Sequence, residues 1–530
     1  MQKLLSINNL KKYFPVAKTS IFQKEQLYVR ANEDISIDIF EGETIGLVGE
    51  SGCGKSTLGR VLLQLYDQTA GSTMYYGRDL NAVAPSYVLN TLKRADWYIV
   101  KYQKAQEKAD QLTEKCNALG EEASFFELQE KNLAVAEAKT ALEHVAKILG
   151  GFMIRDTKNG ATLLLEKFNE AVRIAKIDAK MEDIDLETEV LEAGLEHSEK
   201  KDSIQKKIAK LSVKRQALSV QRQQCKEKAD AISKRVEEAK RPYMQDKDFL
   251  RFEEMLDNGI DLSRLTEAEM RTLRKDLQVI FQDPYSSLNP RMTIGQIIEE
   301  GLTTHKFFKP GSAKMKEYVF KTMQSCGLQN YMYNRYPHQF SGGQRQRISI
   351  ARSLAVKPKF VVCDECVSAL DVSIQSQIIN LLQDLKEQEK LTYLFISHDL
   401  SVVRYISDRI GVMYLGNMVE VAPTDVIFAD PRHPYTVALL SSIPTTDPDS
   451  LTKERIILEG NIPSPIKPPS GCKFHTRCYM ACEKCKRVPP VLTEVEPGHF
   501  VACHNLDRKL DENGNYLFDI HDFAGTNARV

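Results

Sequence analysis

The stretch that decides the fold of this chain is Gly49-Glu50-Ser51-Gly52-Cys53-Gly54-Lys55-Ser56-Thr57. It follows the pattern G-x-x-x-x-G-K-[ST], in which the glycines let the backbone curl so that several N–H groups point into one concavity and hold phosphate oxygens. Lys55 is expected to place its charge against the β- and γ-phosphates of a nucleotide, and the hydroxyl of Ser56 is expected to bind Mg²⁺. All nine residues are therefore predicted to bind the phosphates of a nucleotide such as ATP.

The residues on either side of this loop have the patterns of a strand and a helix. Residues 44–48 form an apolar run typical of a buried strand, and residues 58–63 have the pattern of a helix. A helix that begins directly after the loop points its N-terminus, with its unpaired backbone N–H groups, at the bound anion. This order of strand, loop and helix argues against a chance glycine-rich turn.

The bulk composition limits the function classes. With 530 residues the chain is long enough for about three domains, at roughly 150 residues each. Its 72 Lys and Arg residues balance 72 Asp and Glu residues, so binding of nucleic acid through bulk charge is not expected. The sequence has no apolar run of about 18 residues that would span a bilayer, and its first residues lack the apolar core of a secretory signal. We therefore expect a cytosolic protein, or one held at the membrane by partners.

Short alternating runs of apolar and polar residues in the region 4–48 predict strands of an antiparallel sheet that leads into the loop. Tyr13 and Phe14 lie in this region. An aromatic ring here can stack on the adenine of a nucleotide, because every base offers a π-face. We predict this role for Phe14 rather than Tyr13. A place in the core or at a sheet edge stays an equal alternative.

A long insertion separates the loop from the rest of the globular sequence. Between about residues 100 and 241 the chain is rich in Lys, Glu, Ala, Gln and Leu, and apolar residues recur at spacings of three and four. Arg215 and Arg222 interrupt the second apolar run. We predict an inserted helical hairpin or small bundle with coiled-coil character over residues 81–264. Its charged blocks are typical of solvated coiled-coil faces, and a docking surface for a partner is the alternative.

Alternating strands and helices after the insertion predict a parallel α/β sheet. Apolar runs at 277–281, 360–365 and 393–396 are its expected strands. Asp364 closes the second of these runs and is expected to bind Mg²⁺, while Glu365 is expected to polarise the attacking water as a general base.

Two further polar residues stand at the ends of the other two strands. Gln282 offers an amide oxygen to Mg²⁺ and an N–H donor to water, and His398 is placed to donate to the γ-phosphate. Taken alone, either residue is more often an ordinary structural side chain. A third motif, Phe340-Ser341-Gly342-Gly343-Gln344, comes just before a predicted amphipathic helix, and Ser-Gly-Gly at a helix N-terminus is another place for an anion.

Taken together, these motifs resemble the ATPase domain of ABC transporters. The resemblance pairs residues 49–57 with Walker A, Gln282 with the Q-loop, 340–344 with the signature (Phe for the commoner Leu), 360–365 with Walker B, 368–371 with the D-loop and His398 with the switch histidine. It implies an ABC-type P-loop ATPase with a parallel sheet core, an antiparallel β subdomain and a helical subdomain. Glu365, His398 and Gln282 would be its catalytic residues, with ATP and Mg²⁺ as cofactors.

The same resemblance implies that two such domains sandwich two ATP molecules head to tail. The signature and the D-loop then serve the ATP that is bound to the opposite subunit. The residues expected to complete the partner's site are Ser341, Gly342, Gly343, Gln344 and Asp371.

A narrower resemblance points to the ATPase subunits of oligopeptide and dipeptide importers (OppF/DppF type). It is carried by residues 281–291, 433–436, 462–465 and 471–478, and it covers about residues 1–80 and 265–505 but not the insertion. It implies a homologous ATPase partner in a heterodimer, two transmembrane permease subunits and an extracytoplasmic peptide-binding protein. The chain would lie at the cytoplasmic face of the cell membrane. Nickel or another small solute in place of a peptide stays open.

We therefore expect three parts. An ABC ATPase domain takes residues 1–80 and 265–420, the helical insertion takes 81–264, and a C-terminal region of the oligopeptide-transporter type with a cysteine cluster takes 421–530.

That C-terminal region is unusually rich in cysteine. Thiolates this dense in a reducing compartment usually hold a metal. The spacing C-x5-C-x6-C-x17-C of Cys472, Cys478, Cys485 and Cys503 resembles that of the peptide-importer subfamily, which implies a [4Fe–4S] cluster. Tetrahedral Zn²⁺ and no metal at all stay open, and Cys482 is a substitute ligand.

An ABC-type ATPase of DNA maintenance or repair with a coiled-coil arm is the rival interpretation. In the chromosome-condensation and break-repair members of that class the coiled coil follows the Q-loop, whereas here the insertion precedes Gln282. We therefore favour an ATPase that powers peptide import, with no nucleic acid partner.

Overall fold

The structure is a computed structural model of the whole chain, and it describes residues 2–18, 26–195, 201–443 and 456–506. The chain folds into two compact units, one made of residues 1–73 and 270–530 and the other of residues 74–269. Residues 444–455 and 507–530 of the predicted C-terminal region lie outside the described residues. The predicted division into three parts stays a prediction.

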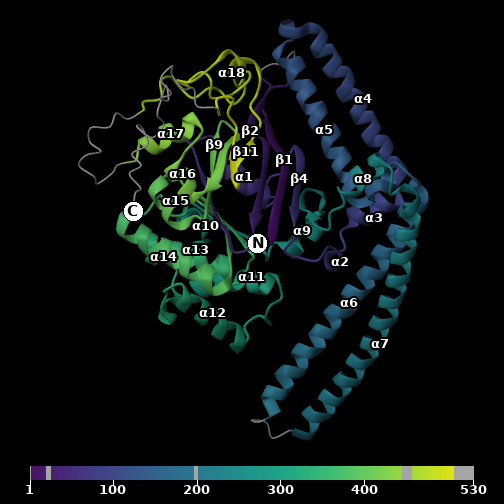
Figure 1. Cartoon of the computed structure of the whole chain (residues 1–530). Coiled ribbons are helices and arrows are strands. Elements are labelled where there is room, and N and C mark those ends of the chain that lie inside the picture. Colours follow the sequence, from purple (N-terminus) through teal and green to yellow (C-terminus); the bar gives the residue numbers. More distant parts are fainter. Residues whose placement is uncertain (1, 19–25, 196–200, 444–455, 507–530) are drawn as a thin grey trace. The chain divides into compact units, whose positions relative to one another are not determined.

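The first unit is built on an eight-stranded sheet with the order β11-β12-β10-β9-β3-β8-β7-β6 (Figure 1). Its strands are β3 (Thr44–Val48), β6 (Leu277–Ile280), β7 (Phe360–Asp364), β8 (Thr392–Ile396), β9 (Arg409–Tyr414), β10 (Asn417–Pro423), β11 (Thr493–Glu496) and β12 (His499–Val501). The strands from β9 through β3, β8 and β7 to β6 run parallel, which confirms the predicted α/β sheet. Because parallel strands end at the same edge, the chain leaves β3, β6, β7 and β8 on one side of the sheet.

A second sheet begins with β1 (Lys3–Pro15) and β2 (Tyr28–Phe40), which pair antiparallel. This confirms the antiparallel strands predicted from alternation ahead of the loop. Ile35 and Ile39 alternate with more exposed residues along β2, and both are fully buried. The next strand of this sheet is β4 (Ala70–Tyr75).

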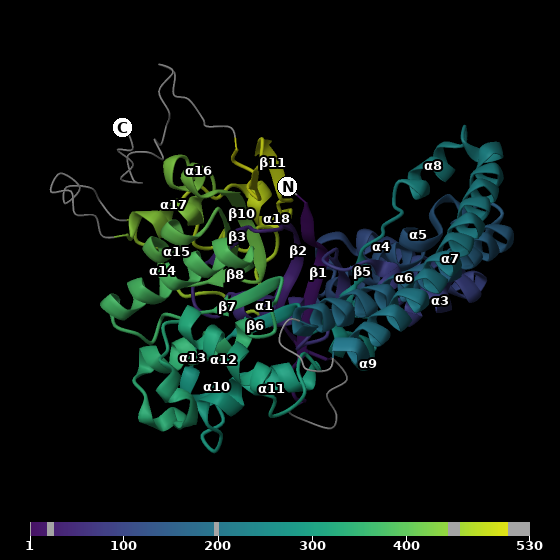
Figure 2. The same cartoon turned by 90° about the horizontal axis from the view of Figure 1, so that it is seen from below.

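The helices of the first unit lie on the faces and at one end of the larger sheet. They are α1 (Lys55–Leu62), α10 (Pro284–Ser287), α11 (Ile294–Thr304), α12 (Ala313–Ser325), α13 (Gly342–Leu354), α14 (Val372–Glu389), α15 (Leu400–Ile406), α16 (Thr424–Ala429), α17 (Pro434–Ser441) and α18 (Glu483–Arg487). Helices α10 to α13 pack on one another, and α13 packs on β6 (Figure 2). Helix α13 begins inside the motif 340–344 rather than after it, because Ser341 and Gln344 cap its first turn reciprocally.

The second unit is mainly helical. Its elements are α2 (Leu80–Val83), α3 (Ser86–Lys93), α4 (Ala95–Leu119), α5 (Phe125–Leu149), α6 (Thr157–Leu195), α7 (Lys201–Lys240), α8 (Lys247–Glu253) and β5 (Ile260–Asp261), and the boundary between the units falls within α9 (Glu267–Leu273). Helices α4 and α5 pack along each other, as do α6 and α7 (Figure 1). Coiled-coil character stays a prediction, since Leu211 and Val236 are the buried residues of α7 while the rest of its apolar run is half-exposed.

The two arginines that interrupt the second apolar run form ion pairs between α6 and α7. Arg215 bonds to Asp185 through two nitrogens, and Arg222 bonds to Asp178 in the same way. Both pairs are largely exposed, so water screens their attraction and they add little to stability. Their main effect is to fix which residues of the two helices face each other.

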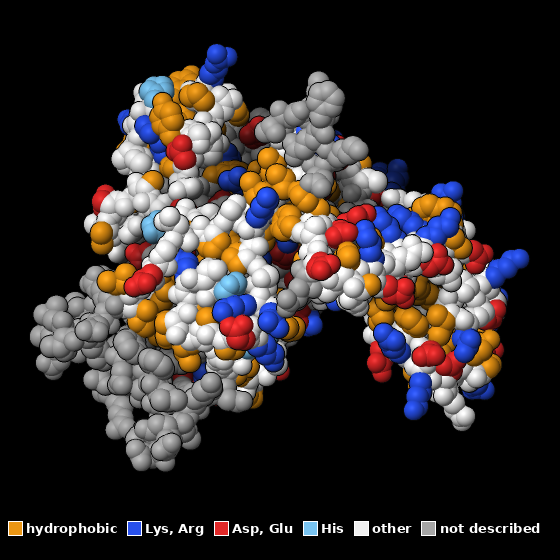
Figure 3. Space-filling model, turned by 90° about the horizontal axis from the view of Figure 1, so that it is seen from above, with side chains coloured by type: hydrophobic (Ala, Val, Ile, Leu, Met, Phe, Trp, Pro, Cys, Tyr) orange, Lys and Arg blue, Asp and Glu red, His pale blue; other side chains and the backbone are white. Residues whose placement is uncertain are grey.

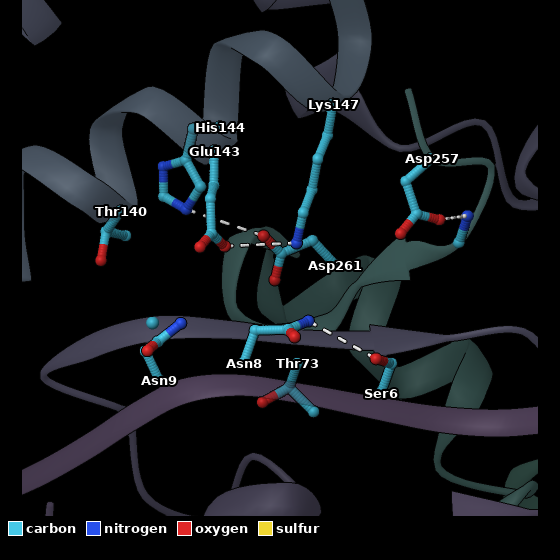
Figure 4. Close-up of polar contacts among 12 residues, drawn as sticks. Ser6, Asn8, Asn9, Thr73, Thr140, Glu143, His144, Lys147, Asp257 and Asp261 are labelled. Carbon is cyan, nitrogen blue, oxygen red and sulfur yellow. Dashed lines mark hydrogen bonds and ion pairs between the residues drawn. The ribbon is translucent and has the colours of Figure 1, made fainter. Parts of the chain in front are cut away.

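A buried polar group holds α5 to the end of the second unit. His144 extends from α5 toward Asp261, and its Nε2 lies 3.6 Å from Asp261 Oδ2 (Figure 4). Burial, together with the charges of Arg264 and Lys147, lowers the pKa of His144 to about 3, and burial raises the pKa of Asp261. His144 is therefore neutral at physiological pH. The contact between His144 and Asp261 therefore gives these polar residues a structural role, and no catalytic role is needed to account for them.

The surface mixes both signs of charge. Lys and Arg side chains lie among Asp and Glu side chains on the face drawn in Figure 3, as the equal totals of the sequence require. In the part of the chain that the structure describes, no helix has the length and apolar character needed to cross a membrane.

Glu420 on β10 ties the C-terminal elements to the sheet. This fully buried carboxylate accepts hydrogen bonds from the backbone N–H groups of Arg432 and His433, and it lies 2.8 Å from Nε2 of His499 on β12. His433 in turn caps α17 by accepting a bond from the N–H of Tyr435. Burial lowers the pKa of His433 to about 4, against the opposing effect of Glu420.

The first prediction concerns the pH dependence of stability. The pKa of His433 is lower in the folded chain than in the unfolded chain, so the unfolded chain binds the extra proton as pH falls from about 6.5 toward 4. We expect this residue to cost about 2 kcal/mol of unfolding free energy between pH 7 and pH 5. His433→Asn keeps a capping acceptor and should remove that part of the pH dependence in urea unfolding followed by circular dichroism. Equal pH dependence in both proteins would contradict it.

Candidate nucleotide-binding site

The predicted site residues converge at the carboxyl edge of the parallel strands. The loop 49–57 follows β3, Gln282 follows β6 and His398 follows β8. Asp364 is the last residue of β7, and Glu365 comes directly after it. The fold therefore brings together side chains that are up to about 350 residues apart in the sequence.

The loop has a backbone that requires glycine. Gly49 and Gly54 have φ angles of 146° and 103°, and a Cβ atom would lie 2.2 Å from the carbonyl oxygen of Met413 at Gly49 and 2.1 Å from that of Ala31 at Gly54. Lys55 is buried, and its Nζ donates to the carbonyl oxygens of Gly49 (2.7 Å) and Glu50 (3.1 Å). The ammonium group thus lies inside the curl of the loop, where the phosphates are expected. No side chain caps the N-terminus of α1, so its N–H groups face the same place.

Two predicted Mg²⁺ ligands touch each other. The Ser56 hydroxyl donates to Oδ1 of Asp364 at 2.5 Å, and Asp364 is 4 % exposed. Arg60 lies 3.5 Å from the other oxygen of the same carboxylate. A hydroxyl beside a buried carboxylate offers two oxygen ligands to a hard cation at the phosphate end of the loop.

The three predicted catalytic side chains also meet. Gln282 Nε2 donates to Oε2 of Glu365 at 2.8 Å, and His398 Nδ1 lies 3.8 Å from the same oxygen. Glu365 has a φ of 48°, which is in the left-handed region that a residue with a Cβ seldom adopts. This backbone turn is observed at the residue expected to act as general base.

The two aromatic residues ahead of the loop have different environments. Tyr13 is buried, and its hydroxyl donates to Glu33 at 2.6 Å. Phe14 is half-buried, with its ring centroid 5.5 Å from that of Tyr66 and the ammonium of Lys12 over its ring at 4.7 Å. Phe14 thus keeps ring surface for a ligand, whereas Tyr13 is committed to the core. The stacking role of Phe14 stays a prediction.

The signature and D-loop residues lie at the surface. Ser341, Gly342 and Asp371 are exposed, and Gly343 and Gln344 are half-exposed. Ser341 caps α13 and Asp371 caps α14, so both loops are ordered by their own helices. Exposure of this kind suits residues expected to serve the ATP of another subunit.

The metal site predicted from the four cysteines gains no support from the structure. Within the described ranges, no three His, Cys, Asp or Glu side chains are arranged to hold a metal ion. In the absence of a metal, burial raises the pKa of Cys478 to about 12 and that of Cys503 to about 11, so both are then neutral thiols at physiological pH. The close sulfur pair that the structure does place is Cys482 with Cys485, at 3.4 Å. This arrangement gives the predicted [4Fe–4S] cluster no support.

Sequence reasoning missed two residues that contact the loop, Tyr435 and Arg477. Glu50 donates its backbone N–H to the hydroxyl of Tyr435 at 2.8 Å, and its carboxylate pairs with Arg477. Arg477 lies between two of the cysteines in the sequence, and the cysteine pattern gives it no role of its own. No spacing rule links it to a loop more than 400 residues earlier.

Comparison with known proteins agrees with this geometry. The description "ABC transporter" matches residues 32–246 and 253–368, and "Oligopeptide/dipeptide transporter, C-terminal region" matches residues 419–485. This chain belongs to the ABC transporter family. As an ABC transporter ATP-binding subunit it is an ATPase that uses ATP and Mg²⁺.

Individual relatives of this ABC ATPase carry names from peptide transport. Oligopeptide transport ATP-binding protein AppF of Bacillus subtilis is 52% identical over 253 residues, which are 47% of this chain and 76% of AppF. Oligopeptide transport ATP-binding protein OppF of Haemophilus influenzae is 50% identical over 253 residues, which are 47% of this chain and 75% of OppF. A solved dimeric ATP-binding cassette with bound ADP and phosphate matches with a TM-score of 0.40 and 16% identity, over 79% of this chain and 99% of that chain.

The second prediction concerns Lys55. Lys55→Ala removes the ammonium group from the loop and should weaken Mg-ATP binding at least about tenfold, since a bond to a charged group contributes about 1.5–3 kcal/mol. The dissociation constant of a fluorescent ATP analogue measures this. Lys321→Ala, which removes an exposed lysine on α12, is the matched control and should bind as the wild type does. Equal affinity of the Lys55 variant would contradict the placement of the phosphates.

Proposed function

We propose that this chain is the ATP-hydrolysing subunit of an ABC importer of oligopeptides or dipeptides. The observation that carries the proposal is the oligopeptide/dipeptide transporter C-terminal region at residues 419–485, on a chain whose ATPase match covers residues 32–246 and 253–368. Relatives named for oligopeptide transport, with 50% and 52% identity over 47% of this chain, support the same solute class.

In this proposal the site works by positioning and charge. The loop N–H groups and Lys55 hold the phosphates, and Ser56 and Asp364 bind Mg²⁺, with Gln282 as a further ligand. Glu365 takes the proton of the attacking water, because its carboxylate is held between Gln282 and His398. His398, with 63% of its side chain exposed, is free to turn toward the γ-phosphate.

A single copy of the site is incomplete in this proposal. Ser341, Gly342, Gly343, Gln344 and Asp371 complete the ATP site of a homologous partner subunit, and ATP closes the pair. The exposed loop after Gln282, where Tyr285 is 64% exposed, passes that closure to two transmembrane permease subunits. An extracytoplasmic peptide-binding protein supplies the solute, and the chain lies at the cytoplasmic face of the membrane.

Two finer hypotheses remain beside the main proposal. The helical insertion is a coiled-coil arm whose role the site does not require. The cysteine cluster as a metal centre has no support from the arrangement of its thiols, and no step of the mechanism uses it. The rival function in DNA maintenance is disfavoured, because the family matches and the relatives' names all lie in transport.

The third prediction tests the general base. Glu365→Gln keeps the shape and the hydrogen bond to Gln282 but cannot accept a proton, so steady-state ATP hydrolysis should fall by about 10²–10⁴-fold while ATP still binds. Phosphate release and nucleotide binding measure the two effects. Glu389→Gln changes a carboxylate at the C-terminal end of α14 and should hydrolyse normally. Unchanged turnover in the Glu365 variant would refute the general-base role.

The fourth prediction tests the assembly. In the proposed assembly each ATP site is completed by the signature motif of the opposite subunit. The isolated chain should therefore hydrolyse ATP slowly, and the complex extracted from membranes in detergent should hydrolyse it faster. Affinity purification followed by mass spectrometry should recover a second ATPase subunit and two integral membrane proteins. Full activity in a monomer, or recovery with chromosomal DNA and no membrane protein, would overturn the proposal.

A further inference from the structure

The segment 471–487, which holds four of the chain's 11 cysteines, contacts the loop 49–57 through a cation that the hydrolysis mechanism does not use. Arg477 Nη1 lies 2.8 Å from Oε2 of Glu50, and Nη2 lies 3.1 Å from Oε1. The side chain of Arg477 is only 7% exposed. A forked bond of this kind fixes both the position and the orientation of the carboxylate, and so of the loop residue that carries it.

A second cation of the same segment reaches the strand on the adenine side. Lys473 Nζ lies 3.0 Å from Oε2 of Glu33, whose other oxygen accepts the hydroxyl of Tyr13. Burial alone would raise the pKa of Glu33, but Lys473 and Lys11 lower it to about 2, so the carboxylate is ionised. Tyr13 directly precedes Phe14, the candidate for adenine stacking. The two cations therefore hold both ends of the predicted ATP site.

An aromatic cluster anchors the segment between these two cations. Phe474 is fully buried, and its ring centroid lies 5.1 Å from that of Tyr414 on β9 and 5.3 Å from that of Tyr435 on α17. The hydroxyl of Tyr435 is the group that accepts the backbone N–H of Glu50. The segment, the sheet and the loop thus share one packed contact. A shift in any of them must be felt by the others.

We propose that the segment 471–487 sets the affinity of the ATP site, and that ATP binding and docking of this segment strengthen each other through Arg477 and Glu50. Arg477 is a positioning residue, since it acts on the phosphates only through the loop. The coupling is reciprocal by thermodynamic necessity: whatever loosens the segment weakens ATP binding, and ATP in turn stabilises the segment. The inference rests on the proposed assignment of the loop 49–57 as the ATP site.

The test compares variants of the full chain in the Glu365→Gln background, so that ATP binds without turnover. Arg477→Ala should raise the dissociation constant of Mg-ATP by about 5- to 150-fold, the usual range of coupling between sites. Arg477→Lys keeps the charge but not the fork, and should fall in between. The matched control is Lys486→Ala, which removes an exposed cation of the same segment that pairs with Glu483. Its affinity should equal that of the parent.

A second measurement separates coupling from general damage. Mg-ATP should slow amide hydrogen exchange in residues 471–487 of the parent and of Lys486→Ala, but not of Arg477→Ala. A merely structural contact would not make exchange in the segment depend on ATP. Glu50→Gln combined with Arg477→Ala should bind ATP no more weakly than the weaker of the two single variants, because both remove the same interaction.

Two results would contradict the coupling. Unchanged ATP affinity in Arg477→Ala, or exchange in the segment that ignores ATP in the parent, overturns the coupling. If Arg477→Ala fails to fold, Arg477→Lys and Glu50→Gln carry the same comparison. Lys55→Ala separates the two assignments: normal ATP binding there refutes the ATP site itself, whereas lost binding there with normal binding in Arg477→Ala refutes only the coupling.

Discussion

The parallel pairing of β3 with β8 on one side and β9 on the other is the constraint on which the rest of the site depends. These strands are fully buried, so their register is fixed by apolar packing on both faces. Their direction decides the chemistry. If β7 ran antiparallel to β3, Asp364 would leave the sheet at the edge opposite to Ser56, and the hydroxyl–carboxylate contact would not exist. Every polar group at the site depends on this apolar core.

Two effects shape the loop after β3. Close backbone contacts exclude side chains at two glycines, and carbonyl oxygens attract the ammonium of Lys55. At Gly49 and Gly54 the backbone comes so close to neighbouring carbonyl groups that no side chain fits. The same closeness turns carbonyl oxygens inward, where they hold the ammonium of Lys55. Besides these carbonyl groups, the ammonium contacts the thiol of Cys53, and a buried cation with such neutral partners is poorly compensated. The negative phosphates of a nucleotide would compensate the charge of this ammonium group.

Features that depend on short-range pattern were predictable from the sequence. The strand 44–48 and the paired carboxylates at the end of β7 follow from apolar runs of the sequence. Features that depend on distant contacts were not. The partner of Glu50 lies 427 residues away, and the aspartates that pair with the arginines of α7 lie on another helix. The cysteine spacing suggested a metal, but thiol positions depend on how loops and a five-residue helix pack, which spacing does not encode.

The left-handed backbone at Glu365 has a consequence of its own. A side chain there costs roughly 1–2 kcal/mol that glycine would avoid, so the chain gives up stability at the residue that we propose as the general base. Stability alone would favour glycine at this position, whereas the proposed general-base role requires the carboxylate. A related chain that no longer hydrolyses ATP would be free to relax at this position first.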